Sequence, residues 1–270
     1  MPKGSNRTLS FMSKKLLVIG SINMDLSLRT ERFPIPGESF LGKEYNWIPG
    51  GKGANQAICA SKIGAETRFL GCVGEDRHGK LLIENLIKNG ILTDLIKYSK
   101  NTHTGLAVVM VEDNGENRII VFPGANMDLN RETIEIAFDD IDEPEGILIN
   151  FEICTEVIEY AIRIAVQKKV PIFVDAGPAK SNLDVQILRG VTVLSPNLSE
   201  MSAILSLLGR KFDLAGIDEV KKEGEYLLNE LDVSYILIKL GSNGAFGIGH
   251  DTSIFIPAFD VQAVDTTAAG

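Results

Sequence analysis

The segment Gly20-Ser-Ile-Asn-Met-Asp25 places an amide and a carboxylate directly after a short apolar run, residues 15–20. If that run is a buried strand, Asn23 and Asp25 lie at its carboxyl end, where open α/β sheets bind their ligands. A turn in which Asn and Asp have their usual structural roles explains the same pattern, and for this segment alone it is the favoured explanation. The segment is not a dinucleotide-binding loop, because the second and third glycines of GxGxxG are absent after Gly20.

A second segment, Pro49-Gly-Gly-Lys-Gly-Ala-Asn-Gln56, opens a helical pattern. Its glycines leave backbone amides bare at a helix N-terminus, beside the ammonium of Lys52 and the amide of Asn55, which suits a polar or anionic ligand. It is not a Walker A loop, since no Ser or Thr follows the lysine. It is not a Rossmann loop either, since Gln56 stands where a third glycine is required. A flexible turn is the structural alternative, but three glycines around one lysine favour a binding function.

Two further segments follow expected strands, and each has a structural and a functional interpretation. In Pro196-Asn-Leu-Ser-Glu200, Asn197 and Glu200 stand one helical turn apart. That spacing is typical of a capping box, and it is equally compatible with a metal or nucleotide site. The segment Lys239-Leu-Gly-Ser-Asn-Gly244 leads into apolar residues that are expected to form further strands. It is either a hairpin turn or a loop whose glycines let a nucleotide lie close to the backbone.

The last ten residues, 261–270, begin as an expected strand and then run into small residues. Successive backbone amides there, at the head of a following helix, would form an anion hole for a phosphoryl group. The sequence ends at Gly270, which is the point where that helix is expected to start.

Elements that position these segments can be read from the apolar pattern. The strands are mostly continuous apolar runs, as in strands buried on both faces, and they alternate with helical patterns, which indicates an α/β fold with a mostly parallel sheet. The expected strands are 15–20, 68–74, 146–150, 171–175, 191–195 and 235–241, and the expected helices are 54–63, 77–89, 155–169, 196–208 and 216–231. A hairpin with an Asn114-Gly115 turn is expected over 105–122, and with the irregular 29–50 it suggests a small β appendage.

Composition narrows the class of protein. The chain has 270 residues, of which 44% are hydrophobic, and a formal net charge of −9. This charge argues against a nucleic-acid or acidic-membrane partner, because both require clustered Lys and Arg, and it favours a small-molecule ligand. Three widely spaced cysteines suggest neither disulfides nor a zinc site, which fits a cytoplasmic protein. Residues 1–11 are expected to be an extension, natural or left from expression, and no stretch reaches the length of a membrane span.

Taken together and in this order, the motifs resemble the ribokinase branch of the PfkB sugar-kinase family over Met12 to Gly270. The matching segments are GSINMD (20–25), PIPGES (34–39), GGKGANQA (50–57), VGEDRHG (73–79), PGAN (123–126), PNLSE (196–200), KLGSNG (239–244) and VDTTAAG (264–270). The resemblance implies a three-layer α/β/α sandwich for residues 12–270. It also implies a β-sheet lid, from about 26–50 and 105–122, that closes over a sugar and often pairs two subunits into a homodimer.

The same resemblance implies a role for each matching residue. The residues implied to bind the sugar are Asn23, Met24, Asp25, Gly51, Lys52, Gly53, Ala54, Asn55 and Glu152. Those implied to hold ATP are Asn197, Lys239, Leu240, Gly241, Ser242, Asn243 and Gly244. Glu200 would organise Mg²⁺ through water, Asp265 and Thr267 would help to bind a monovalent cation, usually K⁺, and the anion hole would be formed by Ala268, Ala269 and Gly270.

The function that the resemblance implies is ATP-dependent phosphorylation of D-ribose at its 5-hydroxyl, giving ribose 5-phosphate and ADP. In the family an aspartate directly after the anion hole takes the proton from the sugar, and this sequence has no residue 271. We therefore expect the C-terminal part of the domain to be missing, the natural protein to continue, and residues 1–270 alone to be inactive. The alternatives are a kinase for another sugar or a nucleoside, and a non-catalytic sugar or nucleotide binder. A nucleotide-dependent oxidoreductase is a more distant alternative.

Overall fold

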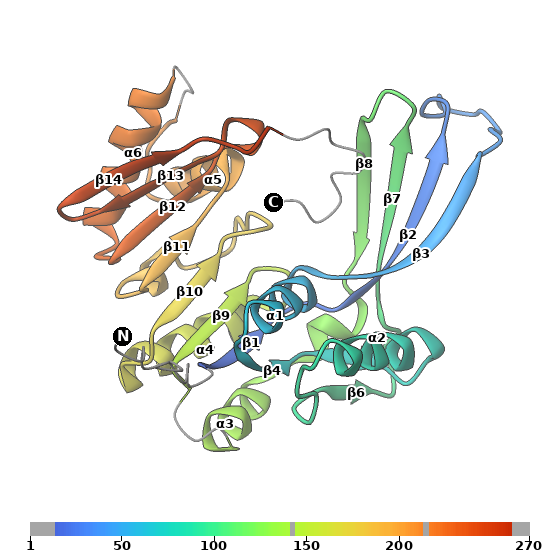
Figure 1. The fold of residues 1–270 in the computed structure, drawn as a ribbon, viewed down its shortest axis with the longest axis horizontal. Coiled ribbons are helices and arrows are strands. Elements are labelled where there is room, and N and C mark those ends of the chain that lie inside the picture. The colour runs from blue at the N-terminus through green and yellow to red at the C-terminus, as the bar shows by residue number, and fades with distance from the viewer. Residues whose placement is uncertain (1–13, 141–143, 213–215, 261–270) are drawn as a thin grey trace, which may run out of the picture.

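A computed structural model describes residues 14–140, 144–212 and 216–260. Its main feature is an eight-stranded sheet in the order β14-β13-β12-β11-β10-β9-β1-β4, drawn in Figure 1. The strands are β1 (Lys15–Ile19), β4 (Glu66–Leu70), β9 (Gly146–Asn150), β10 (Ile172–Asp175), β11 (Val193–Ser195), β12 (Tyr235–Lys239), β13 (Ala245–Gly249) and β14 (Thr252–Ile256). Six neighbouring strands of this sheet, β4, β1, β9, β10, β11 and β12, are parallel to one another, and β13 and β14 extend the sheet as antiparallel strands.

Helices lie on both faces of this sheet (Figure 1). One face is packed against α3 (Arg131–Asp140), α4 (Thr155–Lys168), α5 (Leu198–Leu207) and α6 (Ile217–Glu230). The other face is packed against α1 (Lys52–Lys62), and α2 (Arg77–Lys88) joins the same apolar cluster. The expected α/β/α architecture with a mostly parallel sheet is therefore confirmed.

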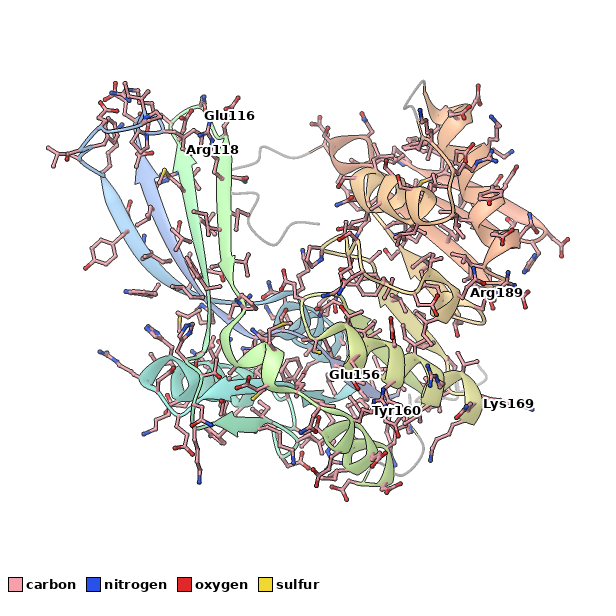
Figure 2. The ribbon with its side chains drawn as sticks, turned by 180° about the vertical axis from the view of Figure 1, so that it is seen from behind. Glu116, Arg118, Glu156, Tyr160, Lys169 and Arg189 are labelled. Carbon is pink, nitrogen blue, oxygen red and sulfur yellow. The ribbon has the colours of Figure 1, made fainter. Side chains whose placement is uncertain are left out.

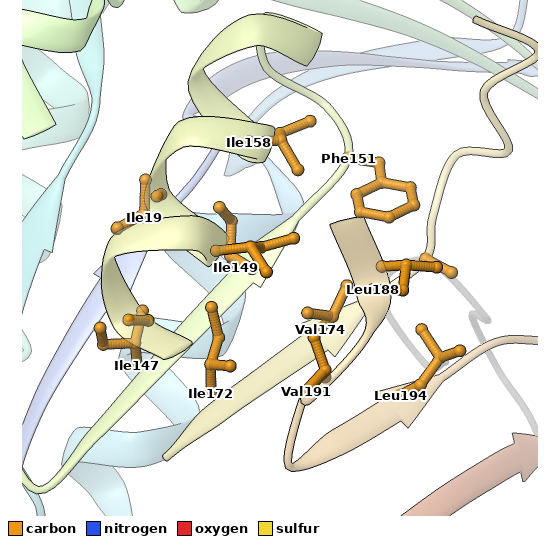
Figure 3. Close-up of a cluster of buried hydrophobic side chains, with 14 of the residues drawn as sticks. Ile19, Ile147, Ile149, Phe151, Ile158, Ile172, Val174, Leu188, Val191 and Leu194 are labelled. Atoms are coloured by element: carbon orange, nitrogen blue, oxygen red, sulfur yellow. The ribbon is translucent and has the colours of Figure 1, made fainter. Parts of the chain in front are cut away.

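The apolar runs of β1 and β9 form strands with both faces covered over most of their length. In β1, Leu17 and Ile19 belong to the core under α3 to α6, while Val18 belongs to the core under α1 and α2, and all three are fully buried. Figure 3 shows the first of these cores, in which Ile147 and Ile149 of β9 lie beside α4. A parallel strand with helices on both sides needs apolar residues at successive positions, which explains the continuous runs.

A separate four-stranded sheet projects from the layered body, as Figure 1 shows. Its order is β3-β2-β7-β8, with β2 (Asn23–Thr30), β3 (Glu44–Gly50), β7 (Gly105–Glu112) and β8 (Asn117–Phe122). The β7–β8 hairpin turns at Asn114-Gly115 as expected, and Gly115 has a φ of 87°. Figure 2 shows Glu116 and Arg118 at the tip of this sheet, away from Glu156 and Tyr160 on α4. We call these four strands the projecting sheet.

The structure differs from the sequence-based expectation in three places. Asn23 and Asp25 are not in a turn after β1 but in β2, so the projecting sheet begins at Asn23 rather than near residue 26. The expected strand 68–74 is two strands, because the chain leaves the main sheet after Leu70. The second strand, β5 (Cys72–Gly74), pairs with the unpredicted β6 (Lys97–Ser99). Helix α3 was also not expected.

Three short 3-10 turns complete the described part of the chain: η1 (Gly124–Asp128), η2 (Val185–Leu188) and η3 (Gly241–Asn243). Among the described helices, none combines the length and the apolar character that crossing a membrane requires.

Candidate functional site

The glycine loop 50–53 lies against the end of β1, backbone on backbone. A Cβ on Gly53 would come within 2.8 Å of backbone atoms of Gly20. Gly51 has a φ of 95°, and a Cβ there would lie 2.7 Å from the amide nitrogen of Asn23. Both positions require glycine, because any larger residue would push backbone away from backbone. Helix α1 starts directly after this contact, so its N-terminal amides lie beside residues 20–25.

A buried amide holds the start of β2 in position. Asn126 of η1 is 1% exposed, and its Oδ1 accepts a hydrogen bond from the amide of Ile22 at 2.9 Å. Its Nδ2 donates to Oδ1 of Asn23 at 2.7 Å and to the carbonyl of Pro123 at 2.9 Å. The Asn23 side chain is therefore fixed by a contact that spans most of the first half of the chain.

The Asp25 carboxylate lies in an apolar part of the projecting sheet. Its cross-strand neighbours are Ile48 of β3 and Ala107 of β7, and a Cβ on Gly50 would overlap its carboxyl group. Its Oδ1 is buried and has no hydrogen-bond partner among the described residues. Burial, and in second place the negative charge of Glu152, raises the pKa of Asp25 from 3.8 to about 6. A buried acceptor of this kind suits a ligand that donates hydrogen bonds.

Glu152 brings a second carboxylate to the start of α1. Its Oε2 accepts hydrogen bonds from the Ser21 hydroxyl at 2.5 Å and from the Lys52 amide at 3.3 Å. A negative charge is favourable there, because the first amides of a helix carry partial positive charge. The Glu152 amide in turn donates to Oδ1 of Asn150 at 3.1 Å, at the end of β9. The acidic group is thus fixed between the glycine loop and the main sheet.

The remaining sugar-side residues divide into two groups. Lys52 and Asn55 are half-exposed, and both line a cavity beside α1. Met24 and Ala54 are 3% and 4% exposed, and their side chains belong to the hydrophobic core between α1 and α2. Their side chains therefore pack the site from behind, and Gly53 contributes backbone only.

A cavity of about 580 Å³ lies between α1 and the exposed face of the main sheet. Its polar lining comes from the first turns of α1 and from the ends of β10 and β12, and includes Lys52, Asn55, Gln56, Asp175 and Lys239. The rest of its lining is largely apolar and includes Cys59, Ile63, Phe173, Val193 and Leu237.

The two expected nucleotide segments meet side by side at the carboxyl ends of β11 and β12. Asn197 and Lys239 form an isolated parallel bridge, and the Lys239 amide donates to the Pro196 carbonyl at 2.9 Å. Neighbouring strands in a parallel sheet end at the same edge, which is why segments 42 residues apart in sequence adjoin here. This edge is the one that also carries the glycine loop and Glu152.

The capping box proposed as one interpretation of residues 197–200 is present. Asn197 Oδ1 accepts from the Glu200 amide at 2.9 Å, and Glu200 Oε2 accepts from the Asn197 amide at 2.7 Å. Ser199 Oγ also donates to Asn197 Oδ1 at 2.8 Å. The two functional candidates therefore have a structural role at the start of α5, which does not prevent a ligand from binding there.

The segment 239–244 is a tight turn between antiparallel strands. The Leu240 amide donates to the Gly244 carbonyl at 2.8 Å, and η3 lies inside the turn. Ser242 and Asn243 are exposed. Gly241 has a φ of 60°, and a Cβ there would meet no atom within 4 Å. The hairpin interpretation is realised, and the turn presents an open backbone surface at the same edge.

The carboxylates of Glu200 and Asp175 both face the ammonium of Lys239. Lys239 Nζ lies 2.8 Å from Asp175 Oδ1 and 3.6 Å from Glu200 Oε2, and the Glu200 residue is 6% exposed. The described residues contain no group of three or more His, Cys, Asp or Glu side chains that could hold a metal by themselves. A metal at this edge would need oxygen ligands from another source, such as a bound phosphate.

Five expected site residues lie outside the described residues. They are the expected cation ligands Asp265 and Thr267 and the expected anion hole, Ala268, Ala269 and Gly270.

Sequence reasoning missed Asn126, Asp175 and Gln56 as parts of the site. Asn126 was included in the motif PGAN without a role, and Gln56 was used only to exclude a Rossmann loop. Asp175 ends an expected strand, and its place at the carboxyl end of β10 was the signal that could have identified it. Gln56 Nε2 donates to Asp175 Oδ2 at 2.9 Å.

A family model described as "pfkB family carbohydrate kinase" matches residues 13–270. The chain belongs to this family. It is 36% identical over 265 residues to a ribokinase of Arabidopsis thaliana, which covers 94% of this chain and 67% of that protein. It is 30% identical to a deoxyribokinase of Salmonella typhi, covering 94% and 81%. It spans 46% of a bifunctional ribokinase/ribose-5-phosphate isomerase A of Fructilactobacillus sanfranciscensis, at 32% identity and 95% of this chain.

Solved structures support the same family. A ribokinase of Thermotoga maritima has a TM-score of 0.82 at 35% identity, covering 95% of this chain and 82% of that one. The structure of Arabidopsis thaliana ribokinase complexed with ribose and ATP has a TM-score of 0.81 at 31% identity, covering 96% and 82%. The main sheet, its helices and the projecting sheet of this pfkB family member therefore have close structural counterparts.

Proposed function

We propose that this protein is an ATP-dependent kinase that phosphorylates D-ribose at the 5-hydroxyl, giving ribose 5-phosphate and ADP. The observation that carries the proposal is the half-buried Asp25 carboxylate, whose buried Oδ1 lacks a partner among the described residues and lies beside the glycine loop. Sugar hydroxyls can donate hydrogen bonds to an oxygen of this kind. Similarity to proteins named ribokinase, one of them solved with ribose and ATP, supports this choice of sugar.

The sugar would be held between the projecting sheet and the start of α1. Asp25 accepts hydrogen bonds from adjacent hydroxyls, and each bond to a charged acceptor contributes about 1.5–3 kcal/mol. Asn23, Lys52, Asn55 and Glu152 would contact the other hydroxyls. The close packing of Gly51 and Gly53 on residues 20–23 would place the first amides of α1 beside the sugar.

ATP would lie along the edge formed by Asn197 and the turn 239–244, with its phosphates directed toward the glycine loop. Mg²⁺ is usually held by one or two carboxylates together with substrate phosphates and water. The donor set fits that pattern, since the Glu200 carboxylate lies at this edge and already faces a cation, the Lys239 ammonium. Mg²⁺ would neutralise phosphate charge, and Glu200 would act on it through water.

Residues 265–270 would complete the reaction centre. Asp265 and Thr267 would help to bind K⁺, and the backbone amides of Ala268, Ala269 and Gly270 would stabilise charge on the transferring phosphoryl group. These roles come from the resemblance to the family, and residues 265–270 lie outside the described residues. Phosphoryl transfer depends mainly on positioning and charge stabilisation, so these groups would act together with Lys239.

A second sugar remains a candidate, because one relative is named deoxyribokinase. Ribose and deoxyribose differ by one hydroxyl, and a site that hydrogen-bonds this hydroxyl discriminates strongly against the sugar that lacks it. The Asp25 oxygen without a partner is a candidate for that discrimination.

Calorimetric titration separates these candidates without turnover, because the residues proposed to bind the sugar all lie among the described residues. We expect D-ribose to bind, and 2-deoxy-D-ribose to bind at least about tenfold more weakly. A preference for deoxyribose would change the assigned substrate. Absence of binding by both sugars, by fructose and by adenosine would contradict the proposed sugar site.

We further propose a cytoplasmic homodimer that pairs through the projecting sheet. Exposed apolar residues gather on it, namely Tyr45, Trp47, Ile119, Ile120, Val121 and Phe122, each between 44% and 67% exposed. Apolar surface of this kind is typical of an interaction site. The three cysteines are free, which suits a reducing compartment. In sedimentation experiments the unmodified protein should be a dimer, and Ile120→Ser should dissociate at higher protein concentration. A monomeric unmodified protein would contradict the pairing.

A further inference from the structure

Three side chains that line the cavity are joined by hydrogen bonds between α1, β10 and β12. Gln56 Nε2 donates to Asp175 Oδ2 at 2.9 Å, and Lys239 Nζ donates to Asp175 Oδ1 at 2.8 Å. Each carboxylate oxygen of Asp175 thus accepts from a different element. We call the residues Gln56, Asp175 and Lys239 the bridge.

The ends of the bridge lie next to the two proposed substrate sites. Gln56 follows Asn55 on α1, in the helix whose first turn carries Lys52 and the glycine loop. Lys239 ends β12 and begins the turn 239–244, and its ammonium also lies 3.6 Å from Glu200 Oε2. Asp175, at the end of β10, is the residue that both ends share.

The members of the bridge are half-buried and have few alternative hydrogen-bond partners. The side chains of Lys239 and Asp175 are 25% and 19% exposed, so their ion pair is partly shielded from water. The Gly177 amide also donates to Asp175 Oδ1 at 3.2 Å, which fixes the carboxylate plane. Gln56 Oε1 is buried and has no partner among the described residues, so this amide is oriented by its bond to Asp175.

Packing alone does not explain these residue types. The neighbouring lining of the cavity is apolar, and a buried or half-buried charge pair is not a general source of stability. A charge network placed between two binding sites can instead transmit the ordering of one site to the other.

We propose that the bridge couples binding of the sugar to binding of the nucleotide, with Asp175 as a positioning residue. This inference rests on the proposed function of the site. A sugar that orders the start of α1 fixes Gln56, Gln56 fixes the Asp175 carboxylate, and Asp175 holds the Lys239 ammonium at the nucleotide edge. The nucleotide then binds to a lysine that is already ordered, and its affinity rises.

Coupling of this kind is reciprocal and typically about 5- to 150-fold. In calorimetric titrations, saturating D-ribose should therefore raise the affinity of the unmodified protein for a non-hydrolysable MgATP analogue by about fivefold or more. The analogue should raise the affinity for ribose by the same factor. Neither measurement requires turnover.

Asp175→Asn keeps the shape of the side chain and removes its charge, and Gln56→Ala breaks the bridge from the side of α1. In both variants the coupling factor should fall to within about twofold of one, while ribose alone still binds. Asp184→Asn is the matched control: this aspartate accepts only a local hydrogen bond from the Gln186 amide at the start of η2, and its coupling should be unchanged.

The outcomes separate the bridge from the proposed function. If ribose and the analogue bind the unmodified protein without mutual effect, or if both folded variants keep the full coupling, the bridge is contradicted and the sugar site stands. If ribose does not bind the unmodified protein, the proposed function fails and the bridge fails with it. Thermal melting of each variant identifies a folding defect. If Asp175→Asn is misfolded, the coupling factor of Gln56→Ala decides instead.

Discussion

The glycine loop 50–53 and the turn 239–244 are both rich in glycine and lie at the same edge of the sheet, but they are held in opposite ways. At Gly53 a Cβ would meet backbone at 2.8 Å, whereas at Gly241 it would meet nothing within 4 Å. The sugar side is fixed by backbone contact and by the buried Asn126. The nucleotide side is fixed by a helix cap and a half-buried ion pair.

This difference predicts how each side responds to change. On the sugar side, the binding geometry and the stability of the fold depend on the same atoms, so a substitution should affect both. On the nucleotide side, Gly241 has open space beside it, whereas Gly244 packs against the backbone of Ile256. A change on the open part of this edge that weakens nucleotide binding should therefore cost less stability than a change in the glycine loop.

Gly53→Ala should have the largest effect. The added methyl group would press on the backbone of Gly20, and overpacking of this kind costs about 2–3 kcal/mol of unfolding free energy. Ribose affinity should fall as well, because the loop must move away from β1. Chemical denaturation and calorimetry measure the two effects.

The matched control is Gly42→Ala, where the nearest atom to an added Cβ is the Arg29 carbonyl oxygen at 3.7 Å. Its stability should change by less than about 0.5 kcal/mol. Similar stability for both alanine variants would remove the basis of the comparison.

Asn126→Ala should have the next largest effect. It leaves the buried Ile22 amide and Asn23 Oδ1 without their partner, which costs about 2 kcal/mol, and it frees Asn23 so that ribose binds more weakly. Asn130→Ala is the control, because Asn130 Oδ1 accepts from the Thr133 amide at the start of α3, away from the site. Its loss should lower stability by about 1 kcal/mol and leave ribose affinity unchanged. Equal ribose affinity in both variants would show that Asn126 does not position Asn23.

The pKa of Asp25, raised to about 6, predicts a dependence on pH. The folded protein binds this proton more tightly than the unfolded chain, so the contribution of Asp25 to stability falls as pH rises from about 4 to 6, and its penalty is complete above 6. After allowance for solvent screening, Asp25→Asn should be more stable than the unmodified protein by about 1–2 kcal/mol at pH 7.5, and similar to it below pH 4. Thermal melting across this range tests the difference.

Ribose affinity should depend on pH in the opposite sense. Below pH 6 the carboxyl group of Asp25 becomes protonated and loses the charge that strengthens its hydrogen bonds to hydroxyls. The affinity should therefore decrease as pH falls through 6. A flat profile between pH 5 and pH 7.5 would assign the hydroxyl contacts to other groups.

The smallest effect is expected for Asn197→Ala on the nucleotide side. It removes the capping box of α5, which costs about 1 kcal/mol of stability. Affinity for an ATP analogue should fall while ribose affinity stays the same. Loss of ribose affinity here would contradict the separation of the two sides.

Much of the main sheet could be predicted from the sequence because strands buried on both faces have continuous apolar runs. The runs over β1 and β9 fall in this class, whereas β10 turns one face, with Phe173 and Asp175, toward the cavity. In contrast, β6 (Lys97–Ser99) has three residues and no apolar pattern, so only its pairing with β5 identifies it as a strand. Asn23 and Asp25 were expected in a turn, because their polar side chains conceal a strand that pairs with β3 and β7.

The site could be predicted where its residues form motifs, and not where they act through distant partners. The glycine loop and the 197–200 segment carry their own local patterns. Asp175 meets Gln56 across 119 positions, and Asn126 meets Ile22 across 104. Contacts of that range depend on strand order and leave no local signature. Met24 and Ala54 were assigned to the sugar through the resemblance to the family; their side chains pack in the core, so a contact with the sugar would have to come from their backbone.

Titration of D-ribose into the protein and into Asp25→Ala tests the central claim most directly. The account predicts that the unmodified protein binds ribose, that Asp25→Ala does not, and that both bind an ATP analogue with similar affinity, because Asp25 lies on the projecting sheet and the nucleotide edge lies across the cavity. Unchanged ribose affinity in a folded Asp25→Ala protein would contradict the sugar site.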